Sequence, residues 1–315
     1  MKQKFSPSLM PREAVLLTCS SHEDRCQGLL SRLGGWKPIG AAIFHYDDSN
    51  PKREQNHEIM EAELRVLGIE PTAIQFAERS AVQSLRSNMD KLKHFISSFP
   101  RAPVVMDISV LTKRHLLMML RWLDDADYWE RLCIVYNEPD DYDVSKHIPL
   151  SFGLLSLQHI PGFSACSDLS RPLHLVLFLG YEGDRALAVH EHVQPMQTTI
   201  VVPDPPYRPS WTGRTESFNA DLIALVGETR IKKADSIDPA GAQQVLKEVF
   251  EDSIERGKHA KAVSPLGTKP QVVGIYEYLR TADDPPSILY ASPLRHNHGF
   301  SSHGTGETWI LKQTG

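Results

Sequence analysis

Short apolar runs alternate with segments of helical spacing along the first 147 residues. The runs are rich in Val, Ile and Leu and end at polar, Gly or Pro positions, which predicts buried strands. The predicted strands cover residues 14–18, 41–46, 72–76, 104–108 and 132–136, and the predicted helices cover residues 20–33, 56–67, 82–99 and 112–123. Strands that alternate with helices of about 10–18 residues are typical of parallel βαβ units.

The same alternation returns after residue 170. The predicted strands cover residues 175–179, 199–202, 229–232, 262–263 and 287–290, with helices after residue 180, over 221–226 and 241–256, and up to 279. The sequence therefore predicts an α/β fold with two tandem Rossmann-like parallel-sheet halves related by internal duplication. The predicted division is residues 1–147 for the first half, a connector over 148–170, and residues 171–315 for the second half, which includes a C-terminal Gly/His-rich loop.

Four local features recur in the same order in the two halves, which supports the duplication. The pairs are Glu23-Asp24-Arg25 with Gly183-Asp184-Arg185, Asp48 with Asp204, Leu111-Thr112-Lys113 with Gly267-Thr268-Lys269, and residues 136–139 with 290–293. The spacing agrees as well, since 88 residues separate Arg25 from Lys113 and 84 separate Arg185 from Lys269. Each feature follows a predicted strand, so all of them should lie at the sheet edge where open parallel sheets bind ligands.

The loop after the fourth strand of each half is the most informative of these features. A small-residue turn before a helix directs backbone N–H groups and the helix dipole at an anion, and Thr and Lys add a hydroxyl and a positive charge. The candidate ligand-binding residues are Asp107, Ser109, Thr112 and Lys113 in the first half and Ser264, Gly267, Thr268 and Lys269 in the second. Phosphate is the expected occupant. The chain lacks GxxxxGK[ST] and a GxGxxG after either first strand, which removes support for a P-loop NTPase or a dinucleotide dehydrogenase.

A strand, a turn ending in Gly-Thr-Lys and a helix, within a half that occurs twice, resembles the CRISPR-associated Rossmann fold (CARF) family and its fused double version, the SAVED domains. The resemblance implies binding of cyclic oligonucleotides or related nucleotide signals. The matching positions in the first strand–helix loops are Ser20, Ser21, Glu23, Asp24 and Arg25, then Tyr181, Gly183, Asp184 and Arg185. The chain departs from the family's Thr-Gly-Gly-Thr-Lys turn, because Val110-Leu111 and Leu266-Gly267 replace the double glycine.

Two further segments are rich in polar or aromatic residues. The C-terminal one, from Arg295 to Glu307, predicts a loop folding over a phosphorylated ligand, with Arg295 and the glycine backbone as donors. His296 and His298 are further candidate ligand-binding residues, and a structural tail is the alternative. A metal site formed with His303 lacks any supporting motif, and we expect neither a metal nor a cofactor. The second segment, residues 207–214, could stack a base or form a surface loop around Trp211.

Composition and charge narrow the function classes. The 315 residues carry 34 Lys and Arg against 39 Asp and Glu, a net charge of −5, so no global basic field exists to hold long nucleic acid. Four scattered cysteines favour a reducing, cytoplasmic location, and no apolar stretch reads as a membrane span.

The leading hypothesis is a protein that binds a nucleotide-type phosphorylated ligand in the cleft between its halves, as a signal sensor in prokaryotic antiviral defence. One alternative is a ring-nuclease-like phosphodiesterase in which Lys269 or a His stabilises phosphate charge and Ser109 or Ser264 positions the attacking group. Another is a non-catalytic interaction subunit of a defence complex. A separate effector protein and a second copy of the chain, as a homodimer, are the protein partners considered.

Overall fold

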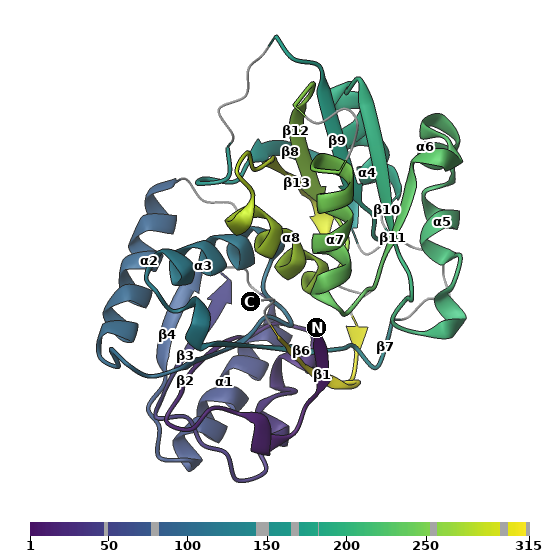
Figure 1. The fold of residues 1–315 in the computed structure, drawn as a ribbon. Coiled ribbons are helices and arrows are strands. Elements are labelled where there is room, and N and C mark those ends of the chain that lie inside the picture. Colours follow the sequence, from purple (N-terminus) through teal and green to yellow (C-terminus); the bar gives the residue numbers. More distant parts are fainter. Residues whose placement is uncertain are drawn as a thin grey trace.

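The computed structural model describes residues 1–46, 50–76, 82–142, 151–164, 170–181, 183–252, 257–296 and 302–312. The chain forms an α/β fold with two sheets of mostly parallel strands, stacked one above the other in Figure 1. Each sheet belongs to one Rossmann-like half.

The first sheet has the order β1-β15-β6-β5-β2-β3-β4. Its strands are β1 (Lys2–Lys4), β2 (Val15–Cys19), β3 (Gly40–Tyr46), β4 (Thr72–Phe76), β5 (Val104–Asp107), β6 (Leu132–Asn137) and β15 (Thr308–Leu311). The five neighbouring strands β4, β3, β2, β5 and β6 are parallel. The strand β15 pairs antiparallel with both β6 and β1. Apart from the edge strand β4, the parallel strands are almost wholly buried, because helices cover both faces of the sheet.

The second sheet has the order β11-β10-β9-β12-β13-β8. Its strands are β8 (Ser151–His159), β9 (Leu173–Phe178), β10 (Gln197–Pro203), β11 (Ile231–Ala234), β12 (Ala260–Pro265) and β13 (Ser287–His296). Numbered within each half, the parallel strands of both sheets follow the order 3-2-1-4-5. In each half an antiparallel strand is added beyond the fifth.

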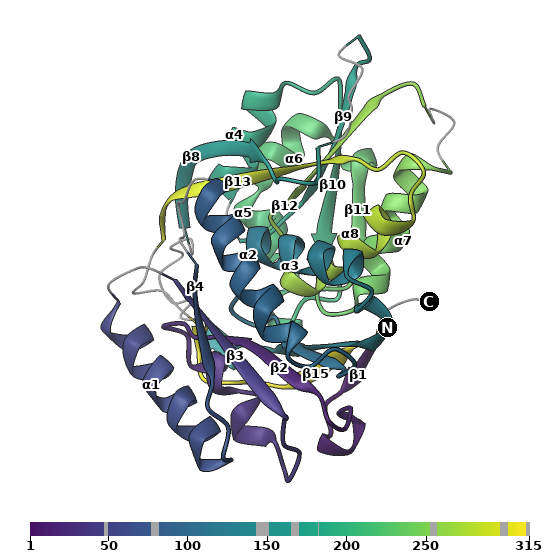
Figure 2. The ribbon, with the colours of Figure 1, turned by 90° about the vertical axis from the view of Figure 1, so that its left-hand side faces the viewer.

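The helices occupy corresponding places in the two halves. They are α1 (Pro51–Val66), α2 (Val82–Ser97) and α3 (Lys113–Asp125), then α4 (Gly183–Val193), α5 (Arg214–Phe218), α6 (Ala220–Val226), α7 (Pro239–Phe250) and α8 (Lys269–Thr281). Figure 2 shows α1 on the outer side of the first sheet and α2 and α3 on the side that faces the second half. The equivalent helices α3 and α8 pack on each other between the sheets.

Polar contacts reinforce the packing of α3 on α8. The Tyr276 hydroxyl donates to Asp124 at 2.8 Å, and Arg280 forms an ion pair with the same carboxylate at 3.1 Å. The Arg280 guanidinium also lies 4.7 Å from the ring centroid of Trp129. Because these residues come from both halves, they help to fix the two sheets relative to each other.

One of the added antiparallel strands crosses between the halves, and the other comes from the predicted connector. The strand β8 comes from the predicted connector yet lies in the second sheet, and β15 comes from the end of the second half yet lies in the first. A separate two-stranded sheet forms where β7 (Asp141–Tyr142) pairs with β14 (Ser302–His303). The segment 148–170 and the C-terminal segment thus each contribute a strand that pairs with a strand far away in sequence.

The structure confirms the parallel strands and most helices within a few residues of their predicted ends, and it corrects one element. Residues 20–33 were predicted as an amphipathic helix but form two 3₁₀ turns, Asp24–Gln27 and Leu30–Arg32. The backbone here passes so close to the C-terminal segment that a Cβ on Gly28 would lie 2.6 Å from Thr305 Cγ2 and 2.7 Å from Asn137 Cγ. Among the described residues, no helix is long and apolar enough to cross a membrane.

Candidate functional site

The carboxyl ends of the central strands of both sheets meet at one cavity of about 290 Å³. This volume lies at the lower end of the range of small-molecule sites. Lining residues come from both halves and from β14. Those that bear charge or aromatic rings are His22, Glu23, Arg25, Tyr46, Arg53, Lys113, Tyr136, Tyr181, Arg185, Tyr207, Lys269 and Tyr290.

Lys113 and Lys269 occupy the first position of α3 and α8, so the N-termini of both helices lie at the cavity. Thr112 caps α3 by accepting from the backbone N–H of His115. Thr268 caps α8 through a reciprocal capping box with Gln271. The same sequence pattern thus places one lysine and one positive helix end on each side of the cavity.

The two lysines are held in a partly buried, cationic environment. Burial lowers the pKa of Lys113 to about 7, with a further contribution from Arg185. Burial also lowers the pKa of Lys269 to about 7, and Arg25 adds to this effect. Lys113 Nζ donates to the Leu266 carbonyl of the opposite half at 2.8 Å. Within the described residues neither lysine forms an ion pair, so an anionic ligand would stabilise the charged form of both.

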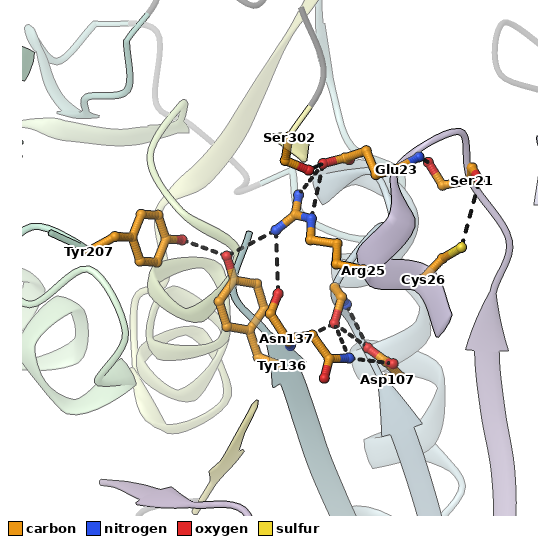
Figure 3. A network of polar contacts seen from close by, with 10 residues as sticks. Ser21, Glu23, Arg25, Cys26, Asp107, Tyr136, Asn137, Tyr207 and Ser302 are labelled. Carbon is orange, nitrogen blue, oxygen red and sulfur yellow. Dashed lines mark hydrogen bonds and ion pairs between the residues drawn. The ribbon is translucent and has the colours of Figure 1, made fainter. Parts of the chain in front are cut away.

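Arg25 is the centre of a buried network on the first-half side (Figure 3). Its Nη2 lies 2.8 Å from Glu23 Oε2, and its Nε donates to the same oxygen at 2.9 Å. Its Nη1 donates to the hydroxyl of Tyr136 at 3.2 Å. The Ser302 hydroxyl of β14 donates to Glu23 as well. Burial alone would raise the pKa of Glu23, but Arg25, Lys269 and Ser302 together lower it to about 2, so the carboxylate stays ionised.

Aromatic rings from both halves surround this network. Tyr136 and Tyr207 lie nearly parallel at 6.2 Å between ring centroids, and their hydroxyls are 2.7 Å apart. Trp211 packs edge-on against Tyr207 at 6.3 Å and against Tyr181 at 5.8 Å. Arg214 lies 5.5 Å from the ring centroid of Tyr181. Such rings offer flat, partly apolar surfaces on which a base can stack.

Asp107, Ser109 and Asn137 form a buried polar network, of which Figure 3 labels Asp107 and Asn137. Asp107 accepts from the Ser109 backbone N–H and from Asn137 Nδ2, both at 2.9 Å. The Ser109 hydroxyl donates to Asp107 and accepts from the Asn137 backbone N–H at 2.7 Å. Burial raises the pKa of Asp107 to about 6, against these hydrogen bonds. The network joins the ends of β5 and β6.

The structure brings half of the predicted ligand-binding residues together. Those that line the cavity are Ser21, Glu23, Arg25, Thr112, Lys113, Tyr181, Arg185, Gly267, Thr268 and Lys269. The hydroxyl of Thr268 is already engaged, because it donates to the Ser236 carbonyl at 2.6 Å and accepts from Gln271 N at 3.2 Å. The two threonines therefore act as helix caps, and the adjacent lysines supply the charge.

The other predicted residues lie elsewhere. Those outside the cavity lining are Ser20, Asp24, Asp107, Ser109, Gly183, Asp184, Ser264 and Arg295. Ser264 is fully buried and donates to the Leu289 carbonyl at 2.9 Å. Ser20, also buried, faces His57 at 3.1 Å. Asp24 pairs with Lys52 at 3.0 Å, and both Asp184 and Arg295 are exposed.

Two predicted histidines cannot be placed. His298 lies outside the described residues, and so does the side chain of His296. His303 of the alternative metal site is exposed on β14. Across the described parts of the chain, no group of His, Cys, Asp or Glu side chains could hold a metal ion.

Several lining residues were not nominated from the sequence. Tyr136 and Tyr290 stand in the fourth repeated feature, at equivalent positions of β6 and β13, which was a usable signal. Tyr46 ends β3 and Arg53 lies on α1, with its guanidinium 5.4 Å from the Tyr46 ring centroid. Ser302 reaches the cavity only through the pairing of β14 with β7, for which the sequence carries no local signal.

The lining is electropositive although the chain is acidic. Its charged members are Arg25, Arg53, Lys113, Arg185 and Lys269 against Glu23, in a protein of net charge −5. The positive charge is thus concentrated where the two halves meet. Together with the helix N-termini, it makes an anion the favoured occupant.

Comparisons with known proteins add little to this geometry. No protein-family model matches the chain, and no curated protein matches it. Among solved structures, an N-terminal ketoreductase from a macrolactin assembly line is similar over 91% of this chain and 72% of its own, at 10% sequence identity and a TM-score of 0.22. A TM-score this low carries no argument about fold or function.

Proposed function

We propose that the protein binds a nucleotide-type phosphorylated ligand in the cavity between its two halves. One observation carries the proposal: Lys113 and Lys269, the lysines of the repeated helix-start motif, line the same cavity, and neither forms an ion pair within the described residues. Buried cations without a counter-charge are costly, and a bound anion offsets that cost. The site is therefore better suited to a charged ligand than to an empty cavity.

The aromatic lining favours a nucleotide over a simple phosphate. Five tyrosines line the cavity, out of nine in the chain. Tyr181, Tyr207 and Tyr290 line the cavity and are only half-buried, so their rings provide surfaces on which a base can stack. A phosphate alone would use the cations and leave this aromatic surface without a role.

The proposed role is recognition of a small nucleotide signal, and a cyclic oligonucleotide is one candidate. The part in antiviral defence that the family resemblance implies stays a prediction, as do the effector protein and the homodimer. The phosphodiesterase alternative loses its nominated serines, because Ser109 and Ser264 are fully buried, outside the lining, with their hydroxyls engaged in hydrogen bonds.

Equilibrium binding by calorimetry tests the proposal. The ligands are adenosine and guanosine 5′-monophosphates, linear di- and trinucleotides, and cyclic oligonucleotides of the same bases. We expect at least one to bind, and the double variant Lys113→Met/Lys269→Met to weaken that binding by about tenfold or more, because charge-assisted hydrogen bonds are worth about 1.5–3 kcal/mol. The control is Lys258→Met, which removes an exposed lysine away from the cavity. Absence of binding across the panel, or equal binding by the double variant, would refute the proposal.

A further inference from the structure

The two sides of the cavity differ at one pair of equivalent positions. The repeated Asp-Arg feature follows Glu23 in the first half and Gly183 in the second. Glu23 lines the cavity and is the one acidic side chain in its described lining. Gly183 has no side chain, and none fits there, because a Cβ would lie 1.7 Å from the Phe218 carbonyl oxygen. The duplicated halves therefore present different charges to a ligand.

On the Glu23 side, the positive charge is partly neutralised. Glu23 holds Arg25 in an ion pair at 2.8 Å. It also interacts electrostatically with Lys269. An ionised carboxylate only accepts hydrogen bonds, so it favours hydroxyl or amino donors and repels phosphate oxygens. The stacked Tyr136 and Tyr207 lie beside the same network (Figure 3).

Lys113, by contrast, lies near a second cation. Its ammonium contacts the Leu266 carbonyl, and Arg185 is the charged group that acts on it most strongly. Two like charges at one partly buried place repel each other, and a phosphate between them would replace that repulsion with two favourable interactions. The N-terminus of α3 adds to the attraction.

We propose that the cavity holds its ligand in a single orientation, with a phosphate group against Lys113 and Arg185 and the hydroxyl or amino donors of a nucleoside against Glu23. This inference rests on the proposed function and narrows its ligand class. The ligand carries its phosphate at one end, and a two-fold symmetric cyclic dinucleotide, which would bring its second phosphate to Glu23, is disfavoured.

The experiment compares four probes by calorimetry: adenosine and guanosine 5′-monophosphates, and the 3′,5′-cyclic dinucleotides of the same bases. Glu23→Gln removes the charge and keeps a hydrogen-bonding side chain of similar size. The matched control Asp24→Asn makes the same change of charge at the neighbouring residue, which lies outside the cavity lining. Lys113→Met and Lys269→Met compare the two sides directly, and circular dichroism checks that each variant is folded.

For the wild-type protein, we expect a monophosphate to bind more tightly than the cyclic dinucleotide of the same base. Glu23→Gln should weaken monophosphate binding and strengthen cyclic dinucleotide binding, changing their ratio by about tenfold, while Asp24→Asn leaves the ratio unchanged. Lys113→Met should weaken monophosphate binding about tenfold and Lys269→Met less than threefold.

Two results overturn the single orientation. One is tighter binding of the cyclic dinucleotide with equal losses in the two lysine variants, which would indicate equivalent half-sites. The other is an equal effect of Glu23→Gln on both ligand classes. In either case ligands still bind and the proposed function stands. If no probe and no member of the wider panel binds, the proposed function fails, and this inference fails with it.

Discussion

Replacing Lys269 by methionine should stabilise the unliganded protein and weaken ligand binding at the same time. Methionine has a similar length and no charge, so the substitution removes the ammonium and keeps the packing of the side chain. Within the described residues Lys269 has no hydrogen-bond or ion-pair partner that the substitution would leave unsatisfied. The expected gain comes from the energetic cost of holding a cation in this cavity.

The magnitude follows from the shifted pKa of Lys269. Burial lowers that pKa from 10.5 to about 7. At about 1.4 kcal/mol per pKa unit, the full shift corresponds to at most about 5 kcal/mol of destabilisation at neutral pH. Because the ammonium is only partly buried and is screened by water, we expect Lys269→Met to raise the free energy of unfolding by about 2 kcal/mol. In a chain of this size, that corresponds to a rise in Tm of about 3 °C.

The pH dependence of stability distinguishes removal of a buried positive charge from a gain due only to the more apolar side chain. Between about pH 7 and 10.5 the unfolded chain keeps the Lys269 proton and the folded chain has lost it, so wild-type stability rises with pH across this window. Below pH 7 both states are protonated and the full cost applies. The advantage of Lys269→Met should therefore be largest near pH 7 or below and shrink toward pH 10.

Thermal and chemical unfolding at pH 7 and pH 10 measure these differences, with Lys258→Met as the exposed-lysine control. Calorimetric titration of the same samples gives the loss of ligand affinity. The reasoning is refuted if Lys269→Met is less stable than wild type at pH 7, or if its advantage is the same at both pH values.

Three further predictions concern binding and folding. Ligand affinity should fall about tenfold between pH 6 and 8.5, because Lys113 and Lys269 lose their protons with pKa values near 7. Titrations in buffers of different ionisation enthalpy should show that the protein takes up protons when the ligand binds. Gly183→Ala should lower the free energy of unfolding by about 1–3 kcal/mol, since the added Cβ would meet the Phe218 carbonyl. If chemical denaturation finds this variant as stable as the wild type, the close packing at Gly183 is contradicted. Asn137→Ala should cost about 1–3 kcal/mol in the same assay, because Asn137 bonds to Asp107 and to Thr308 of β15, and an unchanged midpoint would show that this network contributes little.

The sequence was sufficient to predict the parallel strands and the place of each lysine at the edge of its own sheet. Each central strand is a continuous apolar run, and the carboxyl ends of parallel strands share one edge of a sheet. Lys113 and Lys269 follow the fourth strand of their halves directly, so their place at that edge follows from topology alone. That the two edges face each other depends on the packing of α3 on α8, which the sequence does not specify locally.

Other features could not be predicted because they depend on distant parts of the chain. The strand β15 has only four residues, and it is fixed by pairing with β6, about 170 residues earlier. Asp107 and Ser109 carry the residue types of an anion site, but Asn137 binds both and directs them into the sheet. The segment 20–33 has helical spacing, yet its contacts with Asn137 and Thr305 impose a tighter turn.

The C-terminal segment that crosses to the first half explains why the cavity depends on both halves. Arg32 of the first half donates to the carbonyls of Thr305 and Gly306 at 3.2 and 3.0 Å and to the Thr308 hydroxyl at 3.1 Å. These contacts hold the segment that leads from β14 to β15, and Ser302 at its start bonds Glu23 in the cavity wall. Chain from the end of the second half thus completes the first half's side of the site. The first half does not complete its side of the cavity without this segment, and the second half supplies the other side, so ligand binding reports on the correct assembly of both.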